Sequence, residues 1–130
     1  MSFDKDELKR YRLERAHGAL TEAEILYAAN KVFGTVNRLY YACFYAVSAY
    51  VLSKKMTAIT HSGLKTIFNR ELIKSGKLDA SYGQFFNKLF NYRQEADYDD
   101  SVSFTEDEVG KMLQVVSDFI GEIEKIVASD

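Results

Sequence analysis

The sequence has no proline, no tryptophan and a single cysteine among its 130 residues. Apolar residues still make up 47% of the chain and aromatic residues 14%. This combination is typical of a compact helical protein and argues against a disordered or turn-rich one. The length suits one hydrophobic core and is short for two, so we predict a single domain over residues 1–130.

The single cysteine, Cys43, lies in the apolar run YYACFYAVSAYVL. One cysteine can form neither a disulfide within the chain nor a thiolate metal cluster, which fits a reducing cytoplasm. The first residues, MSFDKDELKR, mix acidic and basic side chains and do not resemble a secretory signal. No apolar run reaches the length of about 18 residues that spans a membrane. We therefore expect a cytoplasmic protein with no membrane partner.

The chain carries a net charge of −2, which gives it no general attraction for nucleic acid. We expect no DNA partner, and any binding of RNA or nucleotides must use a local patch of positive charge. Glycine-rich phosphate loops, nucleophile elbows and zinc motifs are missing, and the two histidines, His17 and His61, do not have metal-binding spacing. We expect no metal and no cofactor.

Apolar residues recur at helical spacing in five segments. Possible caps stand at Asp4, Asp79 and Thr105, and Gly76 is placed to end the third segment. Gly18 could break the first segment, although we favour a continuous helix. The prediction is an all-α, up-and-down antiparallel bundle of four to five helices. The predicted helices cover about residues 4–27, 32–52, 60–74, 79–93 and 105–127.

The predicted second helix is apolar on more than one face, as in the centre of a bundle or an oligomer interface. Arg38 interrupts this surface, and Tyr41 lies one turn further along. Core packing explains the neighbouring apolar residues but not a charged one, so Arg38 is a candidate for an inward or interfacial charge. Together with a second arginine on the fourth helix, it points to an anion site.

That second arginine is Arg93, which continues the apolar stripe of the fourth helix and precedes Asp97 by four residues. The pair could be an ordinary salt bridge at a helix end, worth a few tenths of a kcal/mol. An arginine beside apolar residues nevertheless needs a partner, and a phosphate is one candidate alongside Asp97. Tyr98 lies about 140° further round a straight helix, so it meets Arg93 only across a bend or between subunits.

His61 stands at the predicted start of the third helix, where the helix dipole disfavours its charged form. A lone histidine is more often a cap or a surface residue than a catalyst.

Three segments, NRLYYACFYAVSAYVL, HSGLKTIF and LFNYRQEADYD, together resemble the HEPN domain (higher eukaryote and prokaryote nucleotide-binding) in its small stand-alone prokaryotic form. The resemblance implies an all-α bundle that forms a homodimer and is commonly encoded beside a minimal nucleotidyltransferase as a toxin and antitoxin pair. Many HEPN proteins are metal-independent ribonucleases that use an arginine, four to six intervening residues and then a histidine.

Arg93 matches the arginine of that motif, but Tyr98, Asp99 and Asp100 stand where the histidine should be. Tyrosine, with a pKa of about 10, is a poor general base at neutral pH. The resemblance and this departure from it lead to the expectation of a subunit with little or no enzymatic activity, which binds a nucleotide, RNA or the nucleotidyltransferase.

Under this first hypothesis Arg93, Asp97 and Tyr98 line the binding cleft, and Arg38 and Tyr41 contribute from the second helix. The first alternative is a ribonuclease toxin in which Arg93 stabilises the phosphate and Tyr98 or His61 replaces the missing histidine. The second alternative is a purely structural bundle.

Overall fold

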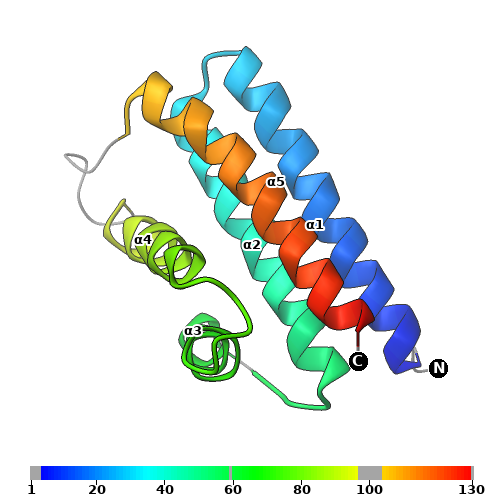
Figure 1. The fold of residues 1–130 in the computed structure, drawn as a ribbon. Helices are drawn as coiled ribbons and strands as arrows, with labels where there is room; N and C mark the ends of the chain where they lie inside the picture. Colours follow the sequence, from blue (N-terminus) through cyan, green and yellow to red (C-terminus); the bar gives the residue numbers. More distant parts are fainter. Residues whose placement is uncertain (1–3, 59, 97–103, 130) are drawn as a thin grey trace.

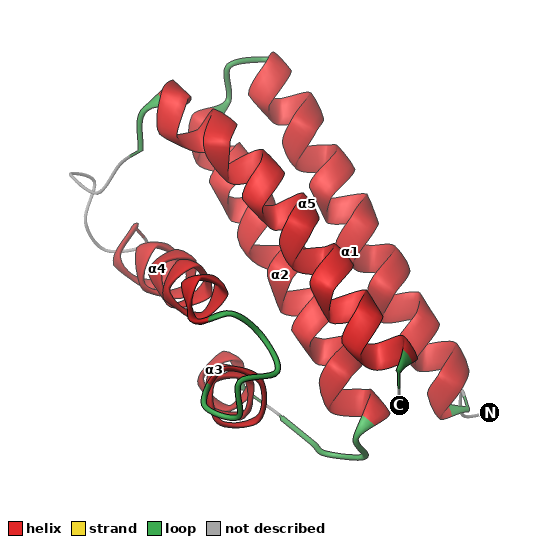
Figure 2. Cartoon of the chain, viewed as in Figure 1, coloured by secondary structure: helices red, strands yellow, loops and turns green. Residues whose placement is uncertain are grey.

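The computed structural model describes residues 4–58, 60–96 and 104–129. Over these residues the chain forms α-helices and one π-helical segment, with no strand, which confirms the predicted all-α bundle (Figures 1 and 2). No helix in the described part of the chain is long and apolar enough to cross a membrane. The elements are α1 (Lys5–Ala28), α2 (Val32–Ser53), α3 (His61–Phe68), the π-helix η1 (Asn69–Ile73), α4 (Ala80–Ala96) and α5 (Glu106–Ala128).

Side-chain caps begin several helices where the sequence predicts them. The Asp4 carboxylate accepts hydrogen bonds from the backbone N–H groups of Asp6 and Glu7, at 2.7 and 3.2 Å. The Thr105 hydroxyl accepts one from the N–H of Glu108 at 3.2 Å. Such caps satisfy donors that the first helical turn leaves without a partner. Helix α1 is continuous through Gly18, as we favoured from the sequence.

The predicted third helix consists of two parts. Its α-helical hydrogen bonding extends from His61 to Phe68, and η1 then continues to Ile73 with the wider π-helical turn. Gly76 follows at a φ of +81°, a left-handed conformation that glycine adopts without steric cost. The predicted end of this segment is therefore correct, whereas its regular α-helical form is not.

Helix α2 is the centre of the arrangement. Figure 1 shows α1, α2 and α5 side by side, with α1 antiparallel to the other two, and α3 and α4 on the opposite side of α2 from α1. Contacts join α2 to α1, α3, α4 and α5. Because α2 is covered on several sides, its apolar residues on more than one face are explained by the fold of a single chain.

The aromatic core joins α4 to its neighbours. The ring of Phe119, from α5, lies 5.7 Å from the ring centroid of Phe68 and 6.0 Å from that of Phe86. Phe86 in turn stacks on Tyr40 of α2 at 6.1 Å, and both side chains are at most 1% exposed. Packing of such rings holds α3 and α4 against α2, which fixes the positions of the candidate site residues on these helices.

Candidate functional site

Five side chains from three helices come together where α3 and α4 face α2. We call them the Arg93 cluster: Arg38, Tyr40, Tyr41, His61 and Arg93. Sequence reasoning had singled out four of them separately, and the structure brings these four into one place. The fifth, Tyr40, had been assigned to the core alone.

Arg93 is half-buried against the two tyrosines. Its Nη2 donates a hydrogen bond to the Tyr41 hydroxyl at 2.8 Å, and its guanidinium carbon lies 5.3 and 5.4 Å from the ring centroids of Tyr41 and Tyr40. Among the side chains that the structure describes, no carboxylate forms an ion pair with it. A guanidinium has five N–H donors, so Arg93 keeps donors for an anion.

A small, mostly apolar pocket adjoins Arg93. The amide side chain of Asn37 and the ring of Phe33, which is 59% exposed, both line it. An exposed aromatic ring beside a cation offers a surface for a planar group such as a nucleobase. The pocket is lined by Phe33, Val36, Asn37, Tyr40, Leu89, Tyr92 and Arg93.

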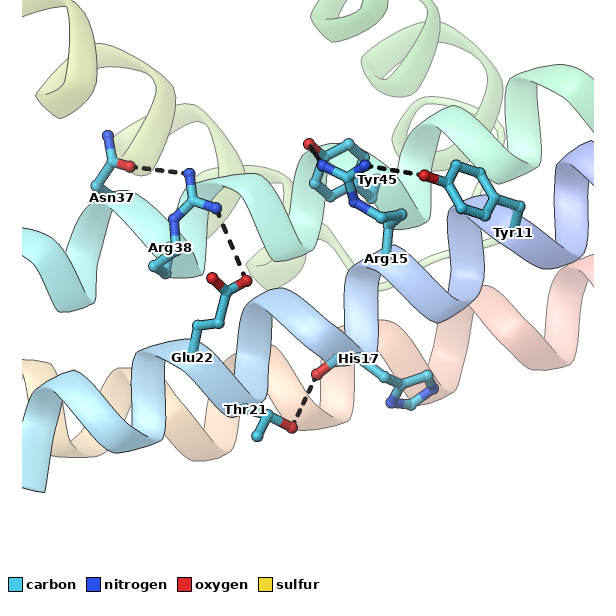
Figure 3. A network of polar contacts seen from close by, with 8 residues as sticks. All are labelled: Tyr11, Arg15, His17, Thr21, Glu22, Asn37, Arg38 and Tyr45. Carbon is cyan, nitrogen blue, oxygen red and sulfur yellow. Dashed lines mark hydrogen bonds and ion pairs between the residues drawn. The ribbon is translucent and has the colours of Figure 1, made fainter.

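Arg38 lies between α1 and α2 and also contacts the ring of Tyr41. Its guanidinium carbon is 4.8 Å from the centroid of the Tyr41 ring. Figure 3 shows its two polar contacts, an ion pair with Glu22 at 3.9 Å and a hydrogen bond to the amide oxygen of Asn37 at 3.2 Å. Arg38 is half-buried, and its long ion pair with an exposed glutamate neutralises it only weakly.

His61 occupies the first position of α3 and contacts α2 through two rings. Its Nδ1 lies 2.7 Å from the Tyr40 hydroxyl, and its imidazole stacks on Phe44 with 4.4 Å between centroids. Burial, followed by the charge of Arg93, lowers the pKa of His61 below its ordinary value of 6.5. Burial raises the pKa of Tyr40 above its ordinary value. At neutral pH the structure therefore holds a neutral imidazole against a neutral phenol.

An amide pair fixes the helices that carry His61 and Arg93 relative to each other. The Asn69 amide nitrogen donates to the Asn87 oxygen at 3.2 Å, and the Asn87 amide donates back at 3.4 Å. Gly83 lets α4 approach η1 closely, since a Cβ built there would stand 2.9 Å from a side-chain carbon of Ile73. Both contacts limit movement between the histidine and the arginine.

Asp97 and Tyr98 lie outside the described residues, and α4 is described to Ala96. The expected pairing of Arg93 with Asp97 and the expected role of Tyr98 therefore stay predictions. Among the described residues, no group of three or more histidines, cysteines or carboxylates could hold a metal ion.

Sequence reasoning missed a third arginine, which lies beside this cluster. Arg15 of α1 donates to the Tyr45 hydroxyl at 2.6 Å and to the Tyr11 hydroxyl at 3.1 Å (Figure 3). The available signal was spacing: Tyr11 and Arg15 are four residues apart, and so are Tyr41 and Tyr45, which puts each pair on one helix face.

The fold and these contacts define a small all-α protein whose candidate site combines arginines with tyrosines. The model of the HEPN domain family matches residues 10–126. The chain therefore belongs to the HEPN domain family.

Individual relatives cover nearly the whole chain. A "UPF0332 protein" of Thermotoga maritima is 36% identical over 124 residues, 95% of this chain and 94% of the relative. A protein of Methanocaldococcus jannaschii named "Putative toxin MJ0142" is 34% identical over 125 residues, 96% of this chain and 84% of the relative. A second protein of that organism with the same kind of name is 29% identical over 113 residues, 87% of this chain and 84% of the relative.

Proposed function

We propose that this HEPN protein binds RNA by a phosphate group held at the Arg93 cluster and has at most weak catalytic activity. The observation that carries the proposal is the half-buried guanidinium of Arg93. Within the part of the chain that the structure describes, it donates a hydrogen bond to the uncharged Tyr41 hydroxyl. A partly desolvated cation gains stability when an anion joins it, and no described carboxylate pairs with Arg93. The planar donor fork of arginine matches a phosphate group.

The surroundings of Arg93 favour a phosphate attached to a nucleoside over a free inorganic anion. Arg38 adds a second positive charge across the Tyr41 ring, and the exposed Phe33 lies beside the adjoining pocket. Stacking of a base on an aromatic ring next to a bound phosphate is the usual way in which proteins hold single-stranded nucleic acid.

Binding of a labelled RNA tests this proposal. We expect a fluorescein-labelled 12-residue oligouridine to bind the purified chain and the Arg93→Gln variant to bind it about tenfold more weakly or worse, as for the loss of a hydrogen bond to a charged group. Arg70→Gln is the matched control, because Arg70 is an exposed arginine on η1 paired with Glu71. Equal affinity of the wild type and Arg93→Gln, with both folded by circular dichroism, would overturn the proposal.

The placement of His61 supports a second candidate function, that of a metal-independent ribonuclease. The imidazole is neutral at neutral pH and sits in the same cluster as Arg93. In this reaction His61 or Tyr98 accepts the proton of a 2′-hydroxyl. The 2′-oxygen then attacks the neighbouring phosphorus, and the 5′-oxygen leaves with a proton from water, giving a cyclic phosphate. Arg93 stabilises the charge on the phosphate oxygens.

RNA cleavage separates the two candidates. If the ribonuclease proposal holds, the wild type cleaves the oligouridine in the presence of EDTA, Arg93→Gln abolishes cleavage, and either His61→Asn or Tyr98→Phe lowers the rate at least a hundredfold. Intact RNA after prolonged incubation with the wild type would rule out this second function and leave the binding proposal standing.

We further propose that the chain works as a homodimer in the cytoplasm, together with a minimal nucleotidyltransferase, as one member of a toxin and antitoxin pair. Two considerations support this proposal: the resemblance that led to the expectation, and the names of the relatives from Methanocaldococcus jannaschii. The second alternative, a purely structural bundle in which Arg93 pairs with Asp97, predicts instead that Arg93→Gln lowers stability and leaves RNA binding unchanged.

A further inference from the structure

We propose that Arg15, Tyr11 and Tyr45 form a second phosphate subsite, and that one single strand of RNA occupies it together with the Arg93 cluster. This inference rests on the proposed function of the Arg93 cluster. It adds that the bound RNA strand extends beyond that cluster to a second site. We call the three residues the Arg15 subsite.

Two tyrosines hold the Arg15 guanidinium in place on the surface. Its carbon lies 4.6 Å from the ring centroid of Tyr45 and 5.8 Å from that of Tyr11, and each phenol oxygen accepts one of its N–H groups. Figure 3 shows the guanidinium against the Tyr45 ring of α2, with the hydroxyl of Tyr11 from α1 pointing toward it. An exposed arginine normally loses side-chain freedom on binding an anion, and here that freedom is already restricted.

The fixed guanidinium still has capacity for an anion. Two of its five N–H groups are used by the phenols, and no described carboxylate forms an ion pair with it. By contrast, the half-buried Lys9 and the exposed Lys125, both on the long helices, pair with acids of their own helix, Asp6 and Glu122. Among the described residues, the Arg15 subsite therefore lacks the counter-charge that Lys9 and Lys125 have.

A continuous path of tyrosine rings connects the two sites. The steps are 4.6 Å from the Arg15 guanidinium to the Tyr45 ring, 6.1 Å from that ring to the Tyr41 ring and 5.3 Å on to the Arg93 guanidinium, so the two guanidiniums lie within about 16 Å of each other. Arg38 borders the same path over Tyr41. This spacing of cations along aromatic rings suits a strand that alternates phosphates with bases, whereas a mononucleotide reaches one site only.

Two RNA ligands of different length test the inference. Uridylyl-uridine carries one phosphodiester and can fill one site at a time, whereas the 12-residue oligouridine can reach both. We expect Arg15→Gln to weaken binding of the 12-mer about fivefold and to reduce the slope of log affinity against log salt by about 0.7, as for the loss of one phosphate contact on a single strand. We expect the affinity for uridylyl-uridine, followed by NMR at the Arg93 cluster, to stay unchanged.

Further variants keep the test specific. Arg15→Lys retains the positive charge and should retain most of the 12-mer affinity, and Arg70→Gln again controls for net charge. If Arg15→Gln binds the 12-mer as tightly as Arg70→Gln does, while Arg93→Gln still binds weakly, the Arg15 subsite is wrong and the proposed function stands. If Arg93→Gln leaves both ligands unaffected, the proposed function itself fails. A change in oligomeric state of Arg15→Gln without a change in RNA affinity would instead assign this surface to a protein partner.

Discussion

Tyr40 and Tyr41 are adjacent on α2, and each contacts a different polar side chain of the site. The Tyr40 hydroxyl pairs with His61 of α3, while the Tyr41 hydroxyl accepts from Arg93 of α4, and the two rings meet edge to face at 5.3 Å. Neutral phenols orient both side chains without neutralising the arginine. Among the residues that the structure describes, no carboxylate offsets the charge of the arginine, and its field acts on the imidazole.

The titration of His61 is a direct test of this arrangement. We expect NMR to give His61 a pKa below 6.5, and Arg93→Gln to move that pKa upward, because removing a positive charge eases protonation. A His61 pKa at or above 6.5 in the wild type would contradict the arrangement.

The same shift predicts how stability depends on pH. The folded protein holds the His61 pKa below that of the unfolded chain, so the unfolded chain binds more protons between the two values. This contribution to the free energy of unfolding is fully present above about pH 6.5 and is lost as the pH falls through the folded pKa. Urea titrations from pH 7.5 to 5 should show a smaller decline in His61→Asn than in the wild type.

The sequence identified individual site residues better than their contacts. Arg38 and Arg93 stood out because a charge among apolar positions requires a reason, and the structure places both against Tyr41. The bond between Tyr40 and His61 could not be predicted, because the apolar pattern buries a tyrosine without saying where its hydroxyl points. Arg15 was missed because exposed arginines on helices are common.

Among the elements, α1, α2 and α5 follow their sequence signals closely, whereas the third segment does not. Caps at Asp4 and Thr105 and the apolar period of each helix were sufficient to place the long helices. The change to a π-helix at Asn69 leaves the inward positions of Leu64, Ile67 and Leu72 buried. At this change Asn69 forms an amide pair with Asn87 of α4, a tertiary contact that the local sequence cannot reveal.

Two glycine substitutions should have opposite effects on stability. Gly83→Ala would place a methyl group 2.9 Å from an Ile73 carbon between α4 and η1, so we expect it to lower the free energy of unfolding by about 1 to 3 kcal/mol. Gly18→Ala meets no atom within 4 Å in the middle of α1, so we expect it to raise stability by about 0.5 to 1 kcal/mol. Chemical denaturation measures both. Similar effects of the two variants would mean that α4 does not approach η1 this closely.

At the scale of the whole molecule, α2 joins the body of the bundle to the two shorter helices. The three long helices lie together, and α3 and α4, which bring His61 and Arg93, pack on α2 rather than on α1 (Figure 1). Displacement of α3 and α4 would therefore open the Arg93 cluster, whereas the Arg15 subsite, built from α1 and α2, would remain intact.

The oligomeric state provides the test at this scale. We expect light scattering after gel filtration to give about twice the chain mass of 14.9 kDa. If the proposed partnership with a minimal nucleotidyltransferase holds, the untagged chain should also co-purify with that partner when the partner carries a tag. A single-chain mass across micromolar to millimolar concentrations would exclude the homodimer, and loss of the chain during affinity purification would exclude a stable complex with that partner.

The double role of Tyr40 affects how genetic screens of this protein should be interpreted. The residue is 1% exposed and stacked on Phe86, yet its hydroxyl contacts His61. In a deep mutational scan, replacements here would remove activity by lowering the amount of folded protein as well as by altering the site, and the two causes would look alike. Arg15 is exposed, so its replacements should leave abundance unchanged. A scan that records abundance beside activity would separate the two classes, and Tyr40→Phe would be the informative allele because it keeps the ring and loses only the hydroxyl.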